Sequence, residues 1–295
     1  MRILPAERDF DRWRKCIPTQ GDLVFFGSKG EATDLSVPVF TPDEVREQSL
    51  GLWKLNDRSW YGYSLNQAKF AVWFPPGAIE SLDQNMRAAI AKLQVKRKVP
   101  TLIAASKLSP ALSRKIPAFA KFHWLTSSVW TSLSRSEQID CMRAWFSQNG
   151  IIAYKSIEFT AMSSSVQKEL RRLKFQNILN TYCDVSGPNC FGAVAGAISA
   201  KNHLKMAKQW LHWKPLERYL EKTGYKKVNA HDPQSRDVFV FFRGKQAVHA
   251  AYYLGDQLYF EKPGQDFYEP YRVEKFDKWK KEWSGTTLSI YRKNR

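Results

Sequence analysis

The sequence lacks a long apolar segment, a signal peptide, internal repeats and low-complexity stretches. No apolar run approaches the roughly 18–20 residues of a membrane-spanning helix, so we expect no transmembrane segment. The first residues, MRILPAERDFDRWRKC, carry charges where a secretory signal peptide has its apolar part. The localisation therefore stays open between the cytoplasm, export without a cleaved peptide, and a mature exported form.

Cysteine is also scarce. The four cysteines, Cys16, Cys141, Cys183 and Cys190, are too few for a disulfide scaffold in a chain of 295 residues. Six residues separate Cys183 from Cys190, whereas paired zinc ligands are usually about two to four residues apart. The sequence predicts no metal site, and its chemistry requires no organic cofactor.

Acidic residues are outnumbered. The chain has 28 Asp and Glu against 46 Lys and Arg, a formal net charge of +18 at pH 7. Both halves of the chain are basic, so the charge is not confined to a tail. Such a charge favours anionic partners: nucleic acid, anionic lipid or an acidic cell-wall polymer. Charge alone does not choose among them.

The pattern of the chain changes near residue 162, which suggests two domains. Before that point, GDLVFF, KFAVWF and IIAYKSIEFTAM have the pattern of strands. TPDEVREQS indicates a helix start with Thr41 as N-cap, and GAIESLDQNMRAAIAKLQ and SRSEQIDCMRAWFSQNG indicate further helices. We expect residues 1–162 to form a mixed α/β accessory domain of unknown role.

The rest of the chain indicates an α+β domain. Helical patterns cover residues 163–183, 190–210 and 214–225. The runs DVFVFF, AVHAAYYL, QLYFE and TTLSIYRK then predict four strands. We expect residues 163–295 to pack a cysteine-bearing helix on an antiparallel sheet.

The stretch SGPNCFGAVAGA places a cysteine where a helix is expected to begin. Asn189 is a favoured N-cap residue after a sharp Gly-Pro turn, so Cys190 is predicted at the first helical position. There the free backbone N–H groups and the helix macrodipole favour a thiolate. Gly192 and Gly196 disfavour a helix, so they imply a close approach, which we expect to be to a sheet. Cys190 is then a nucleophile or, alternatively, a buried structural thiol.

His249 is the candidate base, because it is the polar residue of the apolar run AVHAAYYL. A histidine there needs a hydrogen-bond partner, and we expect Glu261, at the end of QLYFE. A two-residue turn at Gly255-Asp256 would direct Glu261 to the opposite face, so the pairing requires an odd-length loop or a bulge. Alternatively, Glu261 only ends an exposed strand.

These motifs, in this order, resemble those of the NlpC-type papain-like peptidases and amidases of bacterial cell walls. The family has Asp-Cys-Ser-Gly at the start of a helix, then strands similar to GDLVFF and HVGIYLG, and a third polar residue after the histidine. Here the corresponding text is NCFG, RDVFVFF and HAAYYLG, with Glu261 twelve residues after His249. The resemblance covers roughly residues 180–293. Asn189, Phe191 and Glu261 depart from the usual Asp, Ser and His, which leaves the subfamily and the first substrate pocket open.

The resemblance implies a cysteine hydrolase of papain-like fold. His249 would take the proton of Cys190, and Glu261 would orient the imidazole. Tyr182 is the candidate for a second oxyanion donor beside the Cys190 backbone N–H, or else a core residue. The implied substrate is the peptide part of peptidoglycan, which would place the protein in the cell envelope or outside the cell. A delivered toxin or effector that uses the same triad on a protein is a related alternative.

A binding module is the alternative from a different class. The 11 Trp, 12 Tyr and 18 Phe, interleaved with Lys and Arg, could stack bases beside a cationic groove. KLQVKRKVP and FDKWKKEWS are the candidate patches for nucleic acid or another polyanion. We find no nucleic-acid-binding motif, so we favour the hydrolase.

Overall fold

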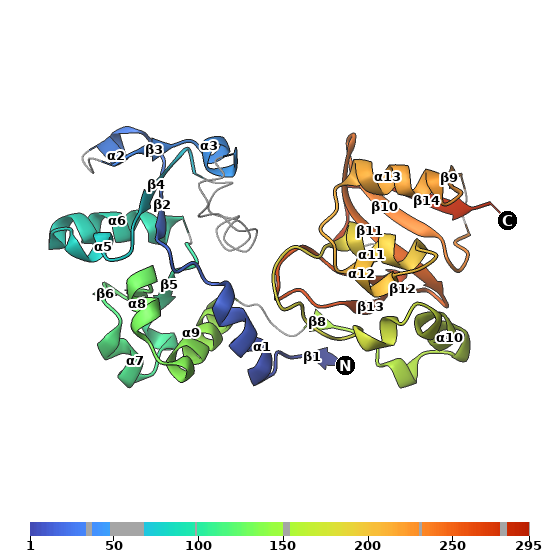
Figure 1. Ribbon diagram of the computed structural model, residues 1–295, viewed down its shortest axis with the longest axis horizontal. Helices are drawn as coiled ribbons and strands as arrows, with labels where there is room; N and C mark the ends of the chain where they lie inside the picture. Colours follow the sequence, from blue (N-terminus) through green and yellow to red (C-terminus); the bar gives the residue numbers. More distant parts are fainter. Residues whose placement is uncertain are drawn as a thin grey trace. The chain divides into compact units, whose positions relative to one another are not determined.

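The computed structural model describes residues 1–33, 37–47, 68–97, 99–149, 154–229, 232–277 and 282–294. The chain divides into two compact units (Figure 1): an N-terminal unit, Ala6–Ile152, and a C-terminal unit that joins Met1–Pro5 to Ala153–Arg295. The first residues belong to the C-terminal unit because strand β1 (Arg2–Ile3) pairs with β8 (Tyr154–Lys155). The division lies at residue 152, whereas the sequence pattern placed it at residue 162.

The N-terminal unit combines helices with two three-stranded antiparallel sheets, of strand order β2-β4-β3 and β5-β7-β6. Its strands are β2 (Asp22–Phe26), β3 (Val39–Phe40), β4 (Phe70–Phe74), β5 (Leu102–Ala104), β6 (Ala118–Phe119) and β7 (Phe122–Trp124). Its helices are α1 (Glu7–Trp13), α2 (Gly30–Thr33), α3 (Pro42–Glu47), α5 (Ala78–Ser81), α6 (Gln84–Lys96), α7 (Pro110–Lys115), α8 (Ser127–Ser132) and α9 (Arg135–Gln148), with 3₁₀ turns η1 (Arg14–Cys16) and η2 (Ala105–Lys107). The strands predicted at GDLVFF and KFAVWF are β2 and β4, which pair with each other.

Several helices of this unit, among them α3 and α6, start at a side-chain cap. Thr41 caps α3 as predicted: its Oγ1 accepts the Glu44 N–H at 3.2 Å, and the Glu44 carboxylate accepts the Thr41 N–H at 2.6 Å. The single helix predicted from GAIESLDQNMRAAIAKLQ is instead the two helices α5 and α6. The break occurs because Asp83 acts as an N-cap and accepts the N–H groups of Asn85 and Met86, both at 2.9 Å.

The C-terminal unit contains a six-stranded antiparallel sheet of order β13-β12-β11-β10-β14-β9. Its strands are β9 (Tyr225–Val228), β10 (Val238–Arg243), β11 (Gln246–Gly255), β12 (Leu258–Glu261), β13 (Arg272–Lys275) and β14 (Thr287–Lys293). Its helices are α10 (Ser164–Arg172), α11 (Cys190–Ile198), α12 (His203–Ala207) and α13 (Trp213–Lys222), with 3₁₀ turns η3 (Phe159–Ala161) and η4 (Phe175–Asn177). The predicted α+β class with an antiparallel sheet is confirmed. None of the described helices is long and apolar enough to cross a membrane.

Both faces of the central strands are buried, which explains why DVFVFF reads as a continuous apolar run. On one face Val238 and Val240 join the core that contains α11, the helix drawn across the sheet in Figure 1. On the other face Phe239 and Phe241 pack in a second cluster with Trp283. Alternate residues of β10 thus enter two different cores.

Two edge strands were not predicted from the sequence. β9 and β13 have four residues each and charged side chains, so neither has the apolar run that marks the inner strands. The strand predicted over IIAYKSIEFTAM is reduced to β8 and is followed by η3, while its residues 151–153 lie outside the described residues.

The helix predicted over residues 190–210 is divided into α11 and α12. Asn202, just before α12, has the left-handed backbone conformation with φ of 62°. The turn folds α12 back onto α11, so that the Gly196 backbone lies against His203 and Ala207. The expectation that the two glycines approach a sheet was wrong: Gly192 contacts Ala207 and Gln209, and Gly196 contacts α12, because the second half of the predicted helix turns back.

Replacing Gly196 with alanine should destabilise the C-terminal unit. An added Cβ would lie 2.6 Å from the His203 carbonyl oxygen and 2.8 Å from the Ala207 backbone nitrogen. Overpacking of this kind costs about 1–3 kcal/mol, more than the roughly 1 kcal/mol that alanine gains over glycine in a helix. Urea unfolding should show a lower free energy of unfolding for Gly196→Ala than for wild type. The control is Gly30→Ala, where no atom lies within 4 Å of the added Cβ; equal stability of Gly196→Ala and wild type would contradict the close approach.

Candidate active site

Cys190 is the first residue of α11, as predicted. Asn189 caps the helix: its Oδ1 accepts the Gly192 N–H at 3.0 Å, and its Nδ2 donates to the Leu211 carbonyl at 2.7 Å. The cap therefore also attaches the segment after α12 to the start of α11. Cys190 retains 6% of its surface, and its backbone N–H is among those that a helix leaves unpaired at its first turn.

His249 lies on β11, opposite Phe241 of β10. The next pair in register is Phe242 with Ala247, so Val248 is an extra residue on β11 and forms a bulge directly beside the histidine. The imidazole is almost completely buried, with 1% of the residue surface exposed.

A second bulge brings Glu261 to the face of His249. Tyr253 pairs with Tyr259, but Gly255 pairs with Leu258, so the register shifts by one residue at Leu254. The turn itself consists of Asp256 and Gln257, both at positive φ (52° and 58°), as in a type I′ hairpin. The sequence analysis required either an odd-length loop or a bulge for this pairing, and the structure has a bulge. His249 Nε2 and Glu261 Oε2 are 2.5 Å apart.

Cys190, His249 and Glu261 form one electrostatic group. Burial by itself lowers the pKa of His249, but the charges of Cys190 and Glu261 and its hydrogen bonds to both raise that pKa to about 10. Because Glu261 takes Nε2, Nδ1 is the ring nitrogen available for the hydrogen bond with the Cys190 thiol. The arrangement favours a protonated imidazole beside the Glu261 carboxylate.

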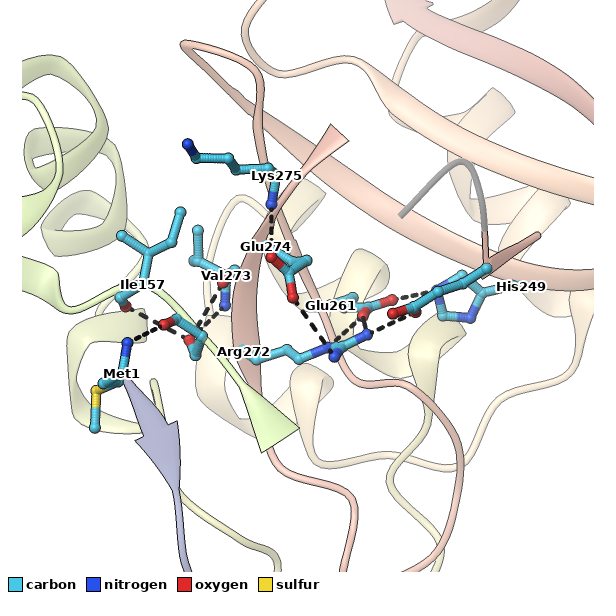
Figure 2. Close-up of polar contacts among 10 residues, drawn as sticks. Met1, Ile157, His249, Glu261, Arg272, Val273, Glu274 and Lys275 are labelled. Atoms are coloured by element: carbon cyan, nitrogen blue, oxygen red, sulfur yellow. Dashed lines mark hydrogen bonds and ion pairs between the residues drawn. The ribbon is translucent and has the colours of Figure 1, made fainter. Parts of the chain in front are cut away.

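Glu261 is in turn held by Arg272, its cross-strand neighbour on β13 (Figure 2). Arg272 Nε donates to Glu261 Oε1 at 2.6 Å, and Nη2 lies 2.6 Å from the same oxygen. Burial by itself raises the pKa of Glu261, but Arg272 and then His249 lower it to about 2. The carboxylate is therefore ionised although only 1% of its residue surface is exposed.

The residues just before β14 cover the same group. The Trp283 ring stacks on the His249 imidazole, with centroids 4.4 Å apart and planes at 9°, and it also stacks on Phe241. The carboxylate of the preceding residue, Glu282, accepts a hydrogen bond from Arg272 Nη2 at 3.0 Å. An indole face attracts a cation, so this stack favours protonated His249. Sequence reasoning missed the roles of both residues here: Arg272 lies in no motif, and Trp283 was named only as part of the candidate polyanion patch FDKWKKEWS.

Tyr182 lies near the nucleophile in sequence, but its hydroxyl is engaged elsewhere. It is buried and donates to the carbonyl of Ile3 at 3.0 Å. Its role as a second oxyanion donor stays a prediction, and it requires the hydroxyl to leave Ile3.

The other histidines have structural or exposed positions, so far as they are described. His123 Nδ1 contacts the Ile116 carbonyl and His203 Nδ1 the Gly196 carbonyl, each at 2.8 Å. His212 is exposed, and His231 lies outside the described residues.

No group of three or more His, Cys, Asp or Glu in the described part of the chain could hold a metal ion. The four cysteines are buried and are not joined in disulfides. Of the two candidate polyanion patches, Lys98 in the first and residues 278–281 in the second lie outside the described residues. The binding-module alternative therefore stays a prediction.

The chain was compared with known proteins at three levels. No protein-family model, curated protein or solved structure matches it. What indicates a function is therefore the geometry of the Cys190 site and the resemblance of its motifs.

Proposed function

We propose that the C-terminal unit is a papain-like cysteine hydrolase of NlpC type that cleaves an amide bond through Cys190, His249 and Glu261. The observation that carries the proposal is the hydrogen-bonded order of the three side chains. His249 bonds to Glu261 at 2.5 Å and also interacts with the thiol at the start of α11. Nucleophile, base and orienting carboxylate are the parts that covalent acyl transfer needs.

In this mechanism the proton of Cys190 moves to His249 Nδ1, and the thiolate attacks the carbonyl carbon of the substrate amide. The oxyanion that forms accepts a hydrogen bond from the Cys190 backbone N–H, a type of contact worth roughly 3 kcal/mol. His249 then gives its proton to the leaving nitrogen as the C–N bond breaks, which leaves a thioester. Water, deprotonated by His249, attacks the thioester and releases the carboxylic acid and the thiol.

The substrate we propose is the peptide part of peptidoglycan, by resemblance of the motifs NCFG, RDVFVFF and HAAYYLG. The net charge of +18 supports an anionic polymer as partner. The N-terminal unit would then position or restrict that polymer. Location in the cell envelope or outside the cell follows from this substrate and is part of the same proposal.

The experiment is digestion of purified peptidoglycan, with released fragments identified by mass spectrometry. Wild type should release muropeptides, and Cys190→Ala should release none. Cys141→Ala is the matched control: burial raises the pKa of that thiol to about 12, so it is not a nucleophile and its removal should not affect cleavage. If no fragments appear with any of the three, peptidoglycan is not the substrate; equal cleavage by Cys190→Ala contradicts the proposed nucleophile.

Glu261→Gln should move the alkaline limit of activity to lower pH. His249 must be protonated to stabilise the thiolate and to protonate the leaving group, so activity is lost as pH rises through its raised pKa of about 10. Removing the Glu261 charge lowers that pKa, and an opposite charge at this distance accounts for about one to three pH units. A pH profile of kcat/KM measures the limit. If the alkaline limit of kcat/KM lies at the same pH in Glu261→Gln and in wild type, Glu261 does not act on His249.

A further inference from the structure

Arg272 has contacts that a residue of an edge strand seldom makes. Its side chain is 7% exposed, and its guanidinium reaches three carboxylates from one position. Glu261 is at 2.6 Å, Glu282 at 3.0 Å and Glu274 at 3.9 Å. Burial by itself lowers the pKa of Arg272, but Glu261 and then Glu282 raise it above its usual range. Arg272 is therefore a permanent buried cation.

The contact also determines how the Glu261 carboxylate is turned. Its two oxygens have different partners: Oε1 accepts from Arg272 Nε, and Oε2 lies against His249 Nε2 (Figure 2). A planar guanidinium holds a carboxylate in a defined plane, which a point charge cannot do. With Oε1 held, Oε2 points at the imidazole.

The charged and titratable groups around Glu261 come from several elements. They are His249 on β11, Tyr259 on β12, Arg272 and Glu274 on β13, Glu282 before β14, Lys262 and Glu269 in the β12–β13 loop and, beyond the imidazole, Cys190. Lys262 directs its ammonium to the carbonyls of Gly264 and Asp266, at 2.7 and 2.9 Å. Arg272 is the cation that, with His249, is in direct contact with the Glu261 carboxylate.

We propose that Arg272 is a positioning residue of the Cys190 site, which keeps Glu261 ionised and directed at His249 and so acts on the thiol through these two side chains. Without Arg272, burial would favour the neutral form of Glu261. A neutral Glu261 stabilises the imidazolium less, and the thiolate of Cys190 loses its counter-charge. The inference rests on the proposed cysteine hydrolase.

The test measures the thiolate directly and needs no substrate. The rate of Cys190 alkylation by iodoacetamide, located by mass spectrometry, is followed from acidic to alkaline pH in wild type and in Arg272→Met. The rate falls at acidic pH as the thiolate–imidazolium pair is lost. We expect this acidic limb to move up by about one to three pH units in Arg272→Met. If the alkylation rate of folded Arg272→Met falls at the same pH as that of wild type, the proposal is overturned.

Two further variants separate a positioning role from a merely structural one. In a Glu261→Gln background, Arg272→Met should cause no additional shift, because the group through which Arg272 acts is gone. Equal shifts in both backgrounds would overturn the proposal. Arg272→Lys keeps the charge but not the planar fork, so the pH at which its alkylation rate falls should lie between the values for wild type and Arg272→Met; a shift as large as that of Arg272→Met would show that charge is not the cause.

The outcomes also distinguish this inference from the proposed function. If wild-type Cys190 reacts no faster than the buried Cys183 at any pH, the proposed nucleophile itself is wrong. If Cys190 reacts selectively and its alkylation rate falls at the same pH in wild type and in Arg272→Met, only the role of Arg272 is wrong. If Arg272→Met does not fold, Glu261→Gln/Arg272→Met should still fold, because it leaves no uncompensated carboxylate; failure of both would show that Arg272 is needed for another reason.

Discussion

Replacing His249 with glutamine is expected to lower kcat/KM for amide hydrolysis by about 10²–10⁴-fold, the contribution of a positioned acid–base group. Glutamine can still bond to Glu261, but it cannot carry the proton from Cys190 to the leaving nitrogen. The loss should appear in kcat, because the imidazolium acts in the chemical steps and not in substrate binding. Steady-state kinetics on released peptides measures it.

The chain offers a matched control for this substitution. His212 is exposed, and its described ring contact is with Trp210, with the two planes tilted by 53°. His212→Gln should therefore leave kcat near the wild-type value. If His249→Gln and His212→Gln have similar activities, His249 is not the base.

The second large effect is on stability. Arg272→Met should reduce the free energy of unfolding by about 3–5 kcal/mol, the usual cost of removing one partner of a buried ion pair. Glu261 would be left 1% exposed without the cation that it contacts at 2.6 Å. Chemical denaturation at neutral pH, followed through a signal of the C-terminal unit, measures the loss.

The double variant makes this prediction specific. Glu261→Gln/Arg272→Met removes both charges and should be more stable than Arg272→Met alone, because a neutral side chain costs far less to bury than an unpaired carboxylate. Arg236→Met is the control in the same unit: its side chain is 59% exposed and contacts Glu169, so the loss should be below about 1 kcal/mol. Equal losses in the single and double variants would mean that the ion pair is not the source of the stability.

Much of the candidate site could be predicted because its signals are local. The cap at Asn189 depends on the few residues around it, and it places Cys190 at a helix start whatever the rest of the chain does. The apolar run AVHAAYYL likewise predicts a buried strand that carries His249. The α+β class follows from the order of such patterns.

Register was only partly predictable. A single extra residue reverses the face on which Glu261 lies, and the sequence showed only that a bulge or an odd loop was necessary. The structure has the bulge at Leu254 and a type I′ turn at Asp256-Gln257. Strand pairing over many residues selects such a register, because both buried faces of β11 must be satisfied together.

The sequence by itself determined the fold class, the start of α11 and the strands that carry His249 and Glu261. Tertiary structure decided which side chains meet: Arg272 with Glu261 across two strands, Trp283 on His249, the Tyr182 hydroxyl on Ile3, and α12 folded against Gly196. The physical reason is the range of the interactions. Caps and periodicity act within one or two turns of chain, whereas a buried ion pair or ring stack exists only after distant segments have packed and excluded water.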